Sequence, residues 1–207
     1  MSFVKLCTLV AVFCALLIAN SCAVLFPDYT WATRIIKAIN PSKHVDISST
    51  LHFCSILSAF IPVDFYDLRP ARIDLDDLRS LKGGLMQLPF ENDSVKSISC
   101  MHTVEHIGLG RYGGPLDPDG DLKPLEELKR VCAKYGNLLI VVPVGKPKVV
   151  FNAHRIYDPH TILTYMSGFR LKEFALVTDS DEFMLNAPLS LGTIQNYGCG
   201  CFWFVIN

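Results

Sequence analysis

Two histidines, a glutamate, an arginine and two glycines fall within the eleven residues from His102 to Tyr112. A histidine that titrates near neutral pH can take a proton from a hydroxyl, so His102 or His106 can act as a general base beside Glu105. The residues just before them, Val95 to Met101, are mostly apolar and partly β-branched, which predicts a short buried strand. Ligands of open α/β sheets bind beyond the carboxyl ends of strands, so this stretch is a predicted catalytic site.

The same three residues also fit a second kind of chemistry. His102, Glu105 and His106 match the inverted zinc motif His-x-x-Glu-His, in which both histidines bind zinc from one helix face and the glutamate acts as the base. A zinc hydrolase would need a third ligand from a distant part of the chain. The interpretation that we prefer assigns no metal ligands and keeps the zinc hydrolase as an alternative.

A second cluster of polar and aromatic residues, which includes His154 and Arg155, lies further along the chain. Together with Arg111 and Asp119, these side chains can orient a substrate. Each also has a structural interpretation: Arg111 can pair with Asp117 or Asp119 to fix the intervening loop, and His154 can cap backbone groups. Both interpretations stay open at this stage.

The elements that must position these residues begin with a strand at His44 to Ile47, which contains Asp46. Ser48, Ser49 and Thr50 follow and can cap a helix from about Leu51 to Phe60. The next apolar strand is closed by Asp67. Strand, polar turn, helix, strand and acid is the layout of a nucleotide-binding unit whose second acid accepts ribose hydroxyls. Alternatively, Asp67 caps the turn before Pro70.

Strands and helices alternate through the rest of the chain, which predicts a three-layer Rossmann-like α/β domain with a mostly parallel sheet. The last two strands lack a long crossover helix between them, so the last strand is expected to be antiparallel. The expected elements are a helix at Asp74–Leu81, a strand at Val95–Met101, a helix at Pro124–Lys134, a strand at Leu138–Val144, a helix at His160–Phe169 and strands at Leu171–Val177 and Phe202–Ile206.

The amino-terminal residues differ from the rest in composition. Leu6 to Ala19 contains no charge, and Ser21 and Ala23 give the small-x-small pattern of a cleaved signal peptide. If the apolar run is counted to Phe26, it is also long enough to be an uncleaved membrane anchor. We therefore expect entry into the secretory pathway, with a lumenal or secreted domain and membrane contact only through this segment.

The remaining chain is predicted to form one globular domain. The full sequence has 207 residues, of which 50% are hydrophobic, and this is enough for one domain with a hydrophobic core. Its net charge is -1, so the charge gives no reason to expect binding to nucleic acid. The predicted organisation is a leader at 1–23, a lead-in or stalk at 24–43 and the domain at 44–207.

A set of short motifs, in this order, resembles class I S-adenosylmethionine-dependent methyltransferases. Within them the chain is similar to a family of unknown function, domain 268, that is well represented in nematodes. The resemblance covers about His44 to Asp179. The motifs are Leu88-Pro89-Phe90, Asn92-Asp93-Ser94-Val95, Val104-Glu105-His106 and the helix from Leu125 to Val131, with the narrower match carried by Glu105 to Gly113, Asp117 to Asp121 and Asn152 to Arg155.

The resemblance implies S-adenosylmethionine as cofactor and a small-molecule or glycan hydroxyl as acceptor. This chain departs from the usual methyltransferase motifs at two places. Ser48 and Ser49 replace glycines, and Gly84 replaces an acid that would hold the adenine amine. A catalytically inactive methyltransferase-like binding protein is therefore a further alternative. The residues that the resemblance places at the cofactor are Asp46, Ser48, Asp67, Leu85, Met86 and His102.

Overall fold

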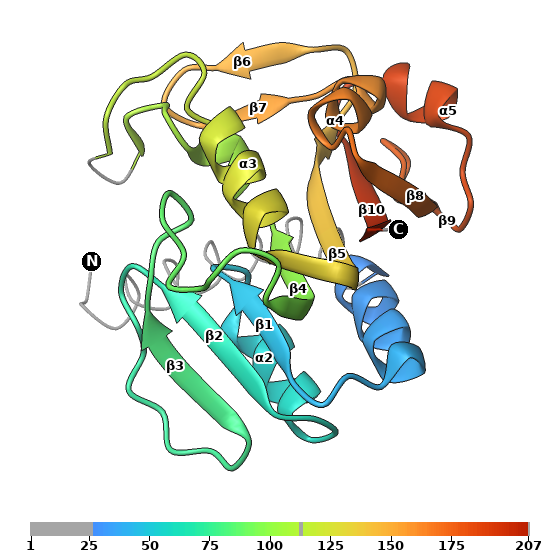
Figure 1. The fold of residues 1–207 in the computed structure, drawn as a ribbon. Coiled ribbons are helices and arrows are strands. Elements are labelled where there is room, and N and C mark those ends of the chain that lie inside the picture. Colours follow the sequence, from blue (N-terminus) through green and yellow to red (C-terminus); the bar gives the residue numbers. More distant parts are fainter. Residues whose placement is uncertain (1–26, 112–113, 207) are drawn as a thin grey trace, which may run out of the picture.

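The protein is built around an eight-stranded sheet with the order β3-β2-β1-β4-β5-β10-β8-β9 (Figure 1). This description comes from a computed structural model and covers residues 27–111 and 114–206. The strands are β1 (His44–Ile47), β2 (Val63–Asp67), β3 (Leu78–Lys82), β4 (Val95–Met101), β5 (Cys132–Val144), β8 (Phe169–Val177), β9 (Phe183–Met184) and β10 (Gly198–Ile206), beside a separate hairpin of β6 (Lys148–Val150) and β7 (His154–Ile156).

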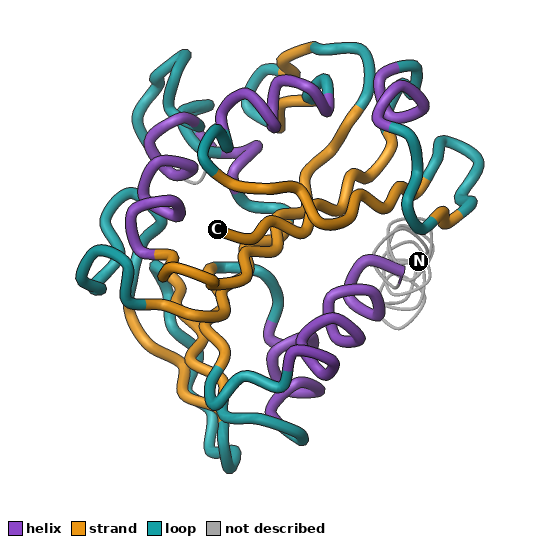
Figure 2. Tube along the Cα trace, turned by 45° about the vertical axis from the view of Figure 1, so that its right-hand side comes forward, coloured by secondary structure: helices purple, strands orange, loops and turns teal. Residues whose placement is uncertain are grey.

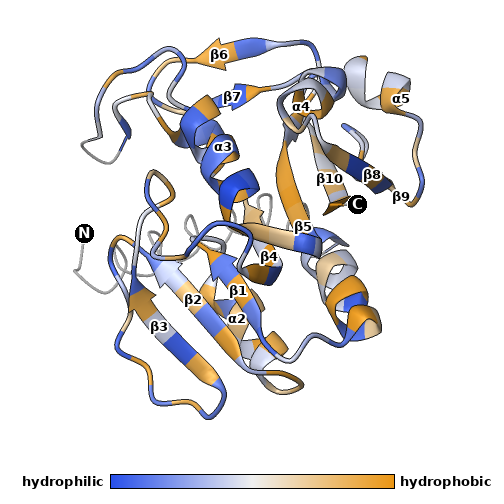
Figure 3. Cartoon of the chain, in the orientation of Figure 1, coloured by the Kyte–Doolittle hydropathy of each residue, from blue (hydrophilic) through white to orange (hydrophobic). Residues whose placement is uncertain are grey.

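Helices cover both faces of this sheet, which makes three layers (Figure 2). One hydrophobic cluster lies between the sheet and the helices α3 (Leu122–Val131) and α4 (Pro159–Tyr165). The other lies between the sheet, α2 (Leu51–Ser58) and the helix at residues 27–39. In Figure 3 most of strand β5 has the colour of hydrophobic residues, whereas most of α3 has the colour of hydrophilic ones. The helices are α2 (Leu51–Ser58), the 3-10 helix η1 (Val104–His106), α3 (Leu122–Val131), α4 (Pro159–Tyr165) and α5 (Leu189–Thr193).

The predicted three-layer Rossmann-like fold is confirmed. Strands β1, β2, β3, β4 and β5 pair in parallel, and β10 pairs antiparallel with both β5 and β8, as expected for the last strand. Thr50 caps α2 by accepting a hydrogen bond from Phe53 N at 3.3 Å. Thr50 is one of the three residues that the sequence offered as caps for this helix, and the apolar strands were predicted from their composition.

The helix predicted at Asp74–Leu81 is wrong, because strand β3 occupies the second half of this stretch and the first half contains no helix. Arg79 lies opposite Asp64 in the parallel register and donates two hydrogen bonds to its carboxylate, each 2.6 Å long. Leu78 is buried beside them. Pairing with β2, rather than local helix propensity, decides the conformation of this segment.

The amphipathic helix α3 ends earlier than predicted, at Val131, and the chain passes directly into β5. Cys132 pairs with Val95 on β4, so the strand begins before the expected helix stop. Tyr135 has a left-handed φ of 60°, and a Cβ on Gly136 would lie 2.6 Å from the oxygen of Ala133. This tight bend explains why turn-forming residues lie inside a strand.

The amino-terminal helix is packed against the sheet. Residues 27–39 bury Trp31, Ala32, Ile35 and Ile36 in the cluster that includes α2. The predicted lead-in therefore contains a layer of the domain. The leader predicted at 1–23 lies outside the described residues, and within 27–111 and 114–206 no helix is long and apolar enough to cross a membrane.

The order of the strands reverses between β1 and β4. From β1 the chain continues outward to β2 and β3, whereas from β4 it continues in the opposite direction to β5. Such a reversal is a topological switch point, where ligands of open α/β sheets bind at the carboxyl ends of the strands. The turn after Ile47 and the segment after Met101 flank this point.

Candidate functional site

The turn after β1 has the backbone conformation of a glycine turn, although it contains serines. Ser48 has a left-handed φ of 56°, which costs an L-residue other than glycine about 1–2 kcal/mol. Its amide donates to the oxygen of Tyr66 at 2.8 Å, and its hydroxyl donates to the same oxygen at 3.2 Å. The turn is therefore held against the end of β2, and Ser48 has the left-handed backbone conformation that glycine adopts most readily.

Asp46 fixes this turn from beneath. The carboxylate is fully buried and accepts hydrogen bonds from Ser49 N at 3.1 Å, from Ser49 Oγ at 2.7 Å and from Ser99 Oγ. Burial raises the pKa of Asp46 to about 6, against the opposing effect of these hydrogen bonds. Because its polar atoms are engaged inside the protein, Asp46 shapes the predicted cofactor cleft through the turn that it holds.

The turn is also joined to the segment after β4. Met101 N donates to Ser49 Oγ at 3.0 Å, and Thr103 Oγ1 donates to the oxygen of Ser48 at 2.9 Å. The two sides of the switch point are thus linked by direct hydrogen bonds.

The other predicted cofactor residues lie near the same edge with different exposures. Asp67 is half-buried at the end of β2, and its Oδ1 accepts a hydrogen bond from Arg69 N at 2.7 Å, as in the turn-capping alternative. Leu85 packs in the core, whereas Met86 is 46% exposed. The left-handed turn and the strand-end carboxylate fit an adenosine cofactor, with Asp67 as the candidate for its ribose hydroxyls.

His102 contacts two residues that were not among the predicted site residues. Its Nε2 lies 2.7 Å from Asp28 Oδ2 and 4.0 Å from Cys199 Sγ. His102 has a left-handed φ of 55°, directly after the last residue of β4. Burial disfavours the imidazolium, but the hydrogen bonds that the protonated ring donates to Asp28 and Cys199 outweigh this effect and raise the pKa of His102 well above its usual value.

Glu105 lies between the two predicted histidines. Its Oε1 is 3.7 Å from His102 Nδ1 and 3.8 Å from His106 Nε2. The side chain is 2% exposed, and its Oε2 is one of few buried polar atoms without a hydrogen-bond partner in the described part of the chain. His106 Nδ1 lies 2.6 Å from the oxygen of Ala153. The predicted catalytic trio is therefore brought together.

The arrangement does not match the inverted zinc motif. His102 follows the end of a strand, and His106 ends a 3-10 helix of three residues, so the two rings do not share a helix face. Among the described residues, the group able to hold a metal ion is instead Asp28, His102 and Cys199.

Arg155 was predicted to contact substrate, and the structure gives it a different place. It is 6% exposed, it donates to the oxygens of Ile107 and Pro118, and its Nε lies 3.4 Å from Asp121 Oδ1. Tyr157 Oη also donates to Asp121, at 2.9 Å. The guanidinium holds the loop after η1, and its contact with a substrate stays a prediction.

The remaining predicted substrate residues lie nearer the surface. Arg111 donates to the oxygen of Ala153 at 2.9 Å, and Asp119 is exposed in the loop. The ring of His154 lies between those of His106 and Tyr197, with centroid distances of 6.5 Å and 4.9 Å. Burial, and then the neighbouring His106, lower the pKa of His154.

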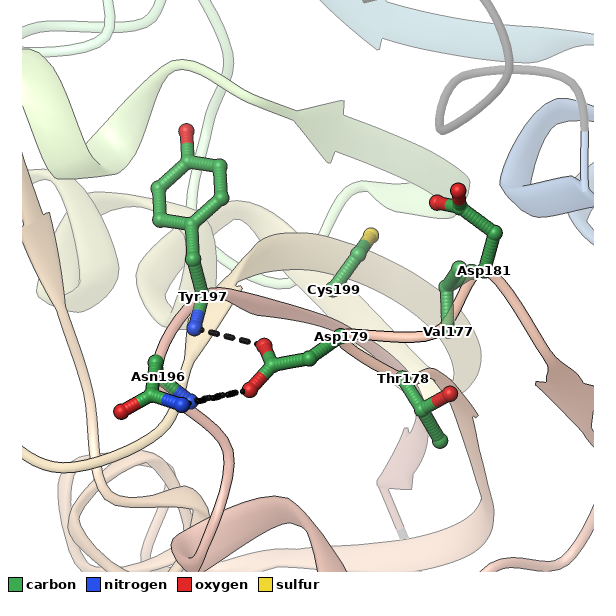
Figure 4. A pocket seen from close by; sticks show the side chains of 7 residues that line it. All are labelled: Val177, Thr178, Asp179, Asp181, Asn196, Tyr197 and Cys199. Atoms are coloured by element: carbon green, nitrogen blue, oxygen red, sulfur yellow. Dashed lines mark hydrogen bonds between the residues drawn. The ribbon is translucent and has the colours of Figure 1, made fainter.

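A cavity of about 350 Å³ lies at the carboxyl end of β8, with Tyr197 in its lining (Figure 4). Asp179 fixes one wall by accepting hydrogen bonds from Tyr197 N at 2.8 Å and Asn196 N at 2.7 Å. In Figure 4 the Cys199 sulfur points away from the Asp179 carboxylate. The cavity is lined by Val177, Thr178, Asp179, Asp181, Asn196, Tyr197 and Cys199.

Sequence reasoning missed Asp28, Tyr197 and Cys199. Cys199 and Cys201 alternate along β10, and residues two apart in a strand face the same side, so the Cys-Gly-Cys run was a signal for a shared face. Asp28 and Tyr197 carry no such pattern, because their proximity to the site follows from tertiary packing.

Comparisons with known proteins agree with this fold. A family model described as "Caenorhabditis protein of unknown function, DUF268" matches residues 86–189. No curated protein matches the sequence at a significant level. A proposed methyltransferase from Bacillus halodurans has a TM-score of 0.60 and 14% identity over 86% of this chain and 98% of its own.

Two further solved structures are similar. A TehB-like S-adenosylmethionine-dependent methyltransferase from Corynebacterium glutamicum has a TM-score of 0.54 and 18% identity over 85% of this chain and 87% of its own. The 1,6-didemethyltoxoflavin-N1-methyltransferase of Burkholderia thailandensis, with bound 1,6-didemethyltoxoflavin and S-adenosylhomocysteine, has a TM-score of 0.57 and 13% identity over 87% and 79%. At these identities the likeness establishes a methyltransferase-like fold.

Proposed function

The chain belongs to the family described as Caenorhabditis protein of unknown function, DUF268, and we propose that it is an S-adenosylmethionine-dependent methyltransferase of the secretory pathway. The observation that carries this proposal is the turn at the switch point. Ser48 adopts the left-handed conformation of a cofactor-binding glycine turn, and Asp67 ends the neighbouring strand. The similar Burkholderia thailandensis enzyme holds S-adenosylhomocysteine, which supports the same class of cofactor.

The cofactor, when bound, supplies an electrophilic methyl group for transfer to an acceptor. Asp67 would hold the ribose hydroxyls, since a carboxylate accepts hydrogen bonds from two neighbouring hydroxyls. The turn at Ser48 would face the cofactor with its backbone, because Asp46 and Tyr66 hold that turn in place. Met86, which is 46% exposed after the buried Leu85, would cover an apolar part of the ligand.

His106 is the better candidate for the general base. Its Nδ1 lies 2.6 Å from a carbonyl oxygen, which can only accept a hydrogen bond, so Nδ1 carries the hydrogen and Nε2 is the basic nitrogen of the neutral ring. The Glu105 carboxylate lies 3.8 Å from this nitrogen and would stabilise the imidazolium after proton transfer. In His102 the Nε2 is already paired with Asp28.

The acceptor would enter near His154 and Tyr197. The cavity beside Tyr197 has about 350 Å³, room for a small molecule or one sugar unit, and its wall contains Asp179 and Asp181. Carboxylates and a tyrosine ring are groups that bind the hydroxyls and the ring faces of sugars. The lining therefore supports a polyhydroxylated acceptor.

The decisive experiment is isothermal titration of the full-length protein with S-adenosylmethionine. Asp67→Ala should weaken binding by roughly ten- to a hundredfold, because hydrogen bonds to a charged acceptor contribute about 1.5–3 kcal/mol. Asp76→Ala is the matched control, since this exposed acid precedes β3 and so lies at the amino end of the parallel strands, away from Asp67 at their carboxyl end. No binding by the wild-type protein at millimolar cofactor would overturn the enzyme proposal and leave the catalytically inactive binding protein as the remaining interpretation.

The secretory placement has its own test at Asn92. Asn92-Asp93-Ser94 is a glycosylation sequon, and Asn92 is exposed in the turn before β4. Arg130 donates to its Oδ1 at 2.8 Å. Lumenal protein should lose mass with a glycosidase, and Asn92→Gln should abolish this change. A cytosolic pool of full-length protein that is insensitive to the glycosidase would contradict the placement.

A further inference from the structure

We propose that Asp28, His102 and Cys199 form a zinc site at the edge of the acceptor cavity. The three side chains come from the amino-terminal helix, from the end of β4 and from the start of β10. Their ligand atoms, Asp28 Oδ2, His102 Nε2 and Cys199 Sγ, all lie within 4.8 Å of one another. Carboxylate, imidazole and thiolate are the three ligand types that zinc binds in proteins.

The spacing requires only a small adjustment. Tetrahedral zinc with bonds of about 2.0–2.1 Å to nitrogen and oxygen separates those two ligands by about 3.3 Å. Asp28 Oδ2 and His102 Nε2 are 2.7 Å apart, so the hydrogen bond between them would open slightly and be replaced by two bonds to the ion. On binding, the proton shared by this pair and the thiol proton of Cys199 leave to solvent.

Two of the three proposed ligands are buried, and a further carboxylate lies next to the third. Asp28 is fully buried and Cys199 is 3% exposed. Glu105 lies on the other side of the His102 ring, 3.7 Å from Nδ1, and its Oε2 is buried without a hydrogen-bond partner in the described residues. A carboxylate beside the second nitrogen of a metal-bound histidine orients the ring and makes it a stronger ligand. A metal at Nε2 would leave the ring proton on Nδ1, the nitrogen that faces the Glu105 carboxylate.

Three protein ligands leave a fourth position, and the side chain of Cys199 lines the cavity of about 350 Å³. Zinc sites with three protein ligands keep that position for water or substrate, and the ion lowers the pKa of a hydroxyl bound there. If the proposed methyl transfer is correct, the ion would activate the acceptor hydroxyl next to His106. The metal site itself does not depend on that function.

Cobalt provides a direct test, because a thiolate bound to Co²⁺ gives an intense near-ultraviolet charge-transfer band. The full-length protein, stripped of metal with a chelator, should develop this band with one equivalent of Co²⁺ and lose it on addition of Zn²⁺. Cys199→Ser should abolish the band, and Asp28→Asn should weaken Zn²⁺ binding by roughly a hundredfold. Glu105→Gln should weaken it by about ten- to a hundredfold.

Cys201→Ser is the matched control, because Cys201 lies two residues along the same strand, is fully buried and is outside the ligand group. It should keep the band, and circular dichroism should show that each variant is folded. Absence of a stoichiometric band in the wild-type protein would overturn the proposal, whatever the variants do. A band that survives Cys199→Ser but is lost in Cys201→Ser would also overturn it. None of these readouts needs S-adenosylmethionine, so they separate the metal site from the enzyme activity.

Discussion

Asp28 Oδ2 lies 2.7 Å from His102 Nε2, although 74 residues separate the two in the chain. This contact attaches the amino-terminal helix to the carboxyl end of β4, beside the switch point of the sheet. Asp28 is fully buried, whereas the His102 side chain is 22% exposed. Removal of His102 would therefore leave a buried carboxylate without this partner, whereas removal of Asp28 would leave a partly exposed imidazole ring.

His102→Ala should destabilise the protein more than Asp28→Asn does. The first change leaves a buried carboxylate without its partner, which costs about 3–5 kcal/mol, whereas the second keeps a polar group next to a ring that can reach water. The double variant should regain part of the loss from His102→Ala. Urea denaturation of the two single variants and the double variant measures this coupling. Purely additive effects would show that the pair contributes nothing.

Replacement by glycine should have a small effect on stability at Ser48 and a larger, destabilising effect at Ser49, the two serines of the turn after β1. Ser48→Gly removes the cost of a left-handed φ, about 1–2 kcal/mol, and loses the hydrogen bond to Tyr66, so its stability should stay within about 1 kcal/mol of wild type. Ser49→Gly removes hydrogen bonds to Asp46 and from Met101 N and should cost about 2–3 kcal/mol.

Ser48→Gly should also bind S-adenosylmethionine at least as tightly as wild type, because glycine is the residue that the turn conformation favours. Thermal unfolding and cofactor titration of the same two variants provide both readouts. A large loss of stability in Ser48→Gly would mean that the hydroxyl, rather than the backbone, holds the turn.

The sequence predicted the layers of this fold because its strands and helices carry strong local signals. The apolar run at Leu138–Val144 lies within β5, which begins earlier, at Cys132, and the cap of α2 is Thr50, one of the three candidates. The strand β3 was missed because it has no such signal: its conformation depends on Arg79 finding Asp64 on the neighbouring strand.

The candidate site was predictable only where its residues are adjacent in the chain. His102, Glu105 and His106 stood out by their spacing, and the structure brings them together. Asp28 and Cys199 reach the same place through the packing of the first helix and of the antiparallel last strand. A pattern confined to one segment cannot contain such long-range contacts.

The two arginines of the predicted substrate site should separate folding from binding. Arg155→Met leaves Asp121, which is 5% exposed, without its cationic partner, and removes the hydrogen bonds that hold Ile107 and Pro118. We expect a loss of about 3–5 kcal/mol, as for a broken buried ion pair. Arg111→Ala should change stability by about 1 kcal/mol or less while it impairs ligand binding.

Thermal unfolding of the two arginine variants, followed by acceptor and cofactor titration of Arg111→Ala, tests this contrast. A large fall in melting temperature for Arg111→Ala with unchanged ligand affinity would show that Arg111 also serves to hold its loop.

The last prediction concerns the pH dependence of stability. His44 is fully buried, and its Nδ1 and Nε2 lie 2.8 Å and 2.9 Å from the hydroxyls of Ser97 and Ser99. Burial lowers the pKa of His44 from 6.5 to about 3. Below pH 6.5 the unfolded chain therefore binds a proton that the folded protein does not, so this group's contribution to stability is complete above pH 6.5 and is lost as the pH falls toward 3. Asp46, joined to His44 through Ser99, acts in the opposite direction, since its raised pKa of about 6 favours proton uptake by the folded state.

Comparison with His44→Gln isolates the histidine, because Asp46 is present in both proteins. Glutamine does not titrate, so the variant should lose less stability than wild type as the pH falls. At pH 7.5 the variant should be the less stable protein, and by pH 4.5 the difference should shrink by about 2–3 kcal/mol, since each pKa unit corresponds to about 1.4 kcal/mol. Urea denaturation at several pH values measures this difference, with His52→Gln on the exposed side of α2 as the control. A difference between wild type and His44→Gln that stays constant from pH 7.5 to 4.5 would mean that His44 is not held neutral in the folded protein.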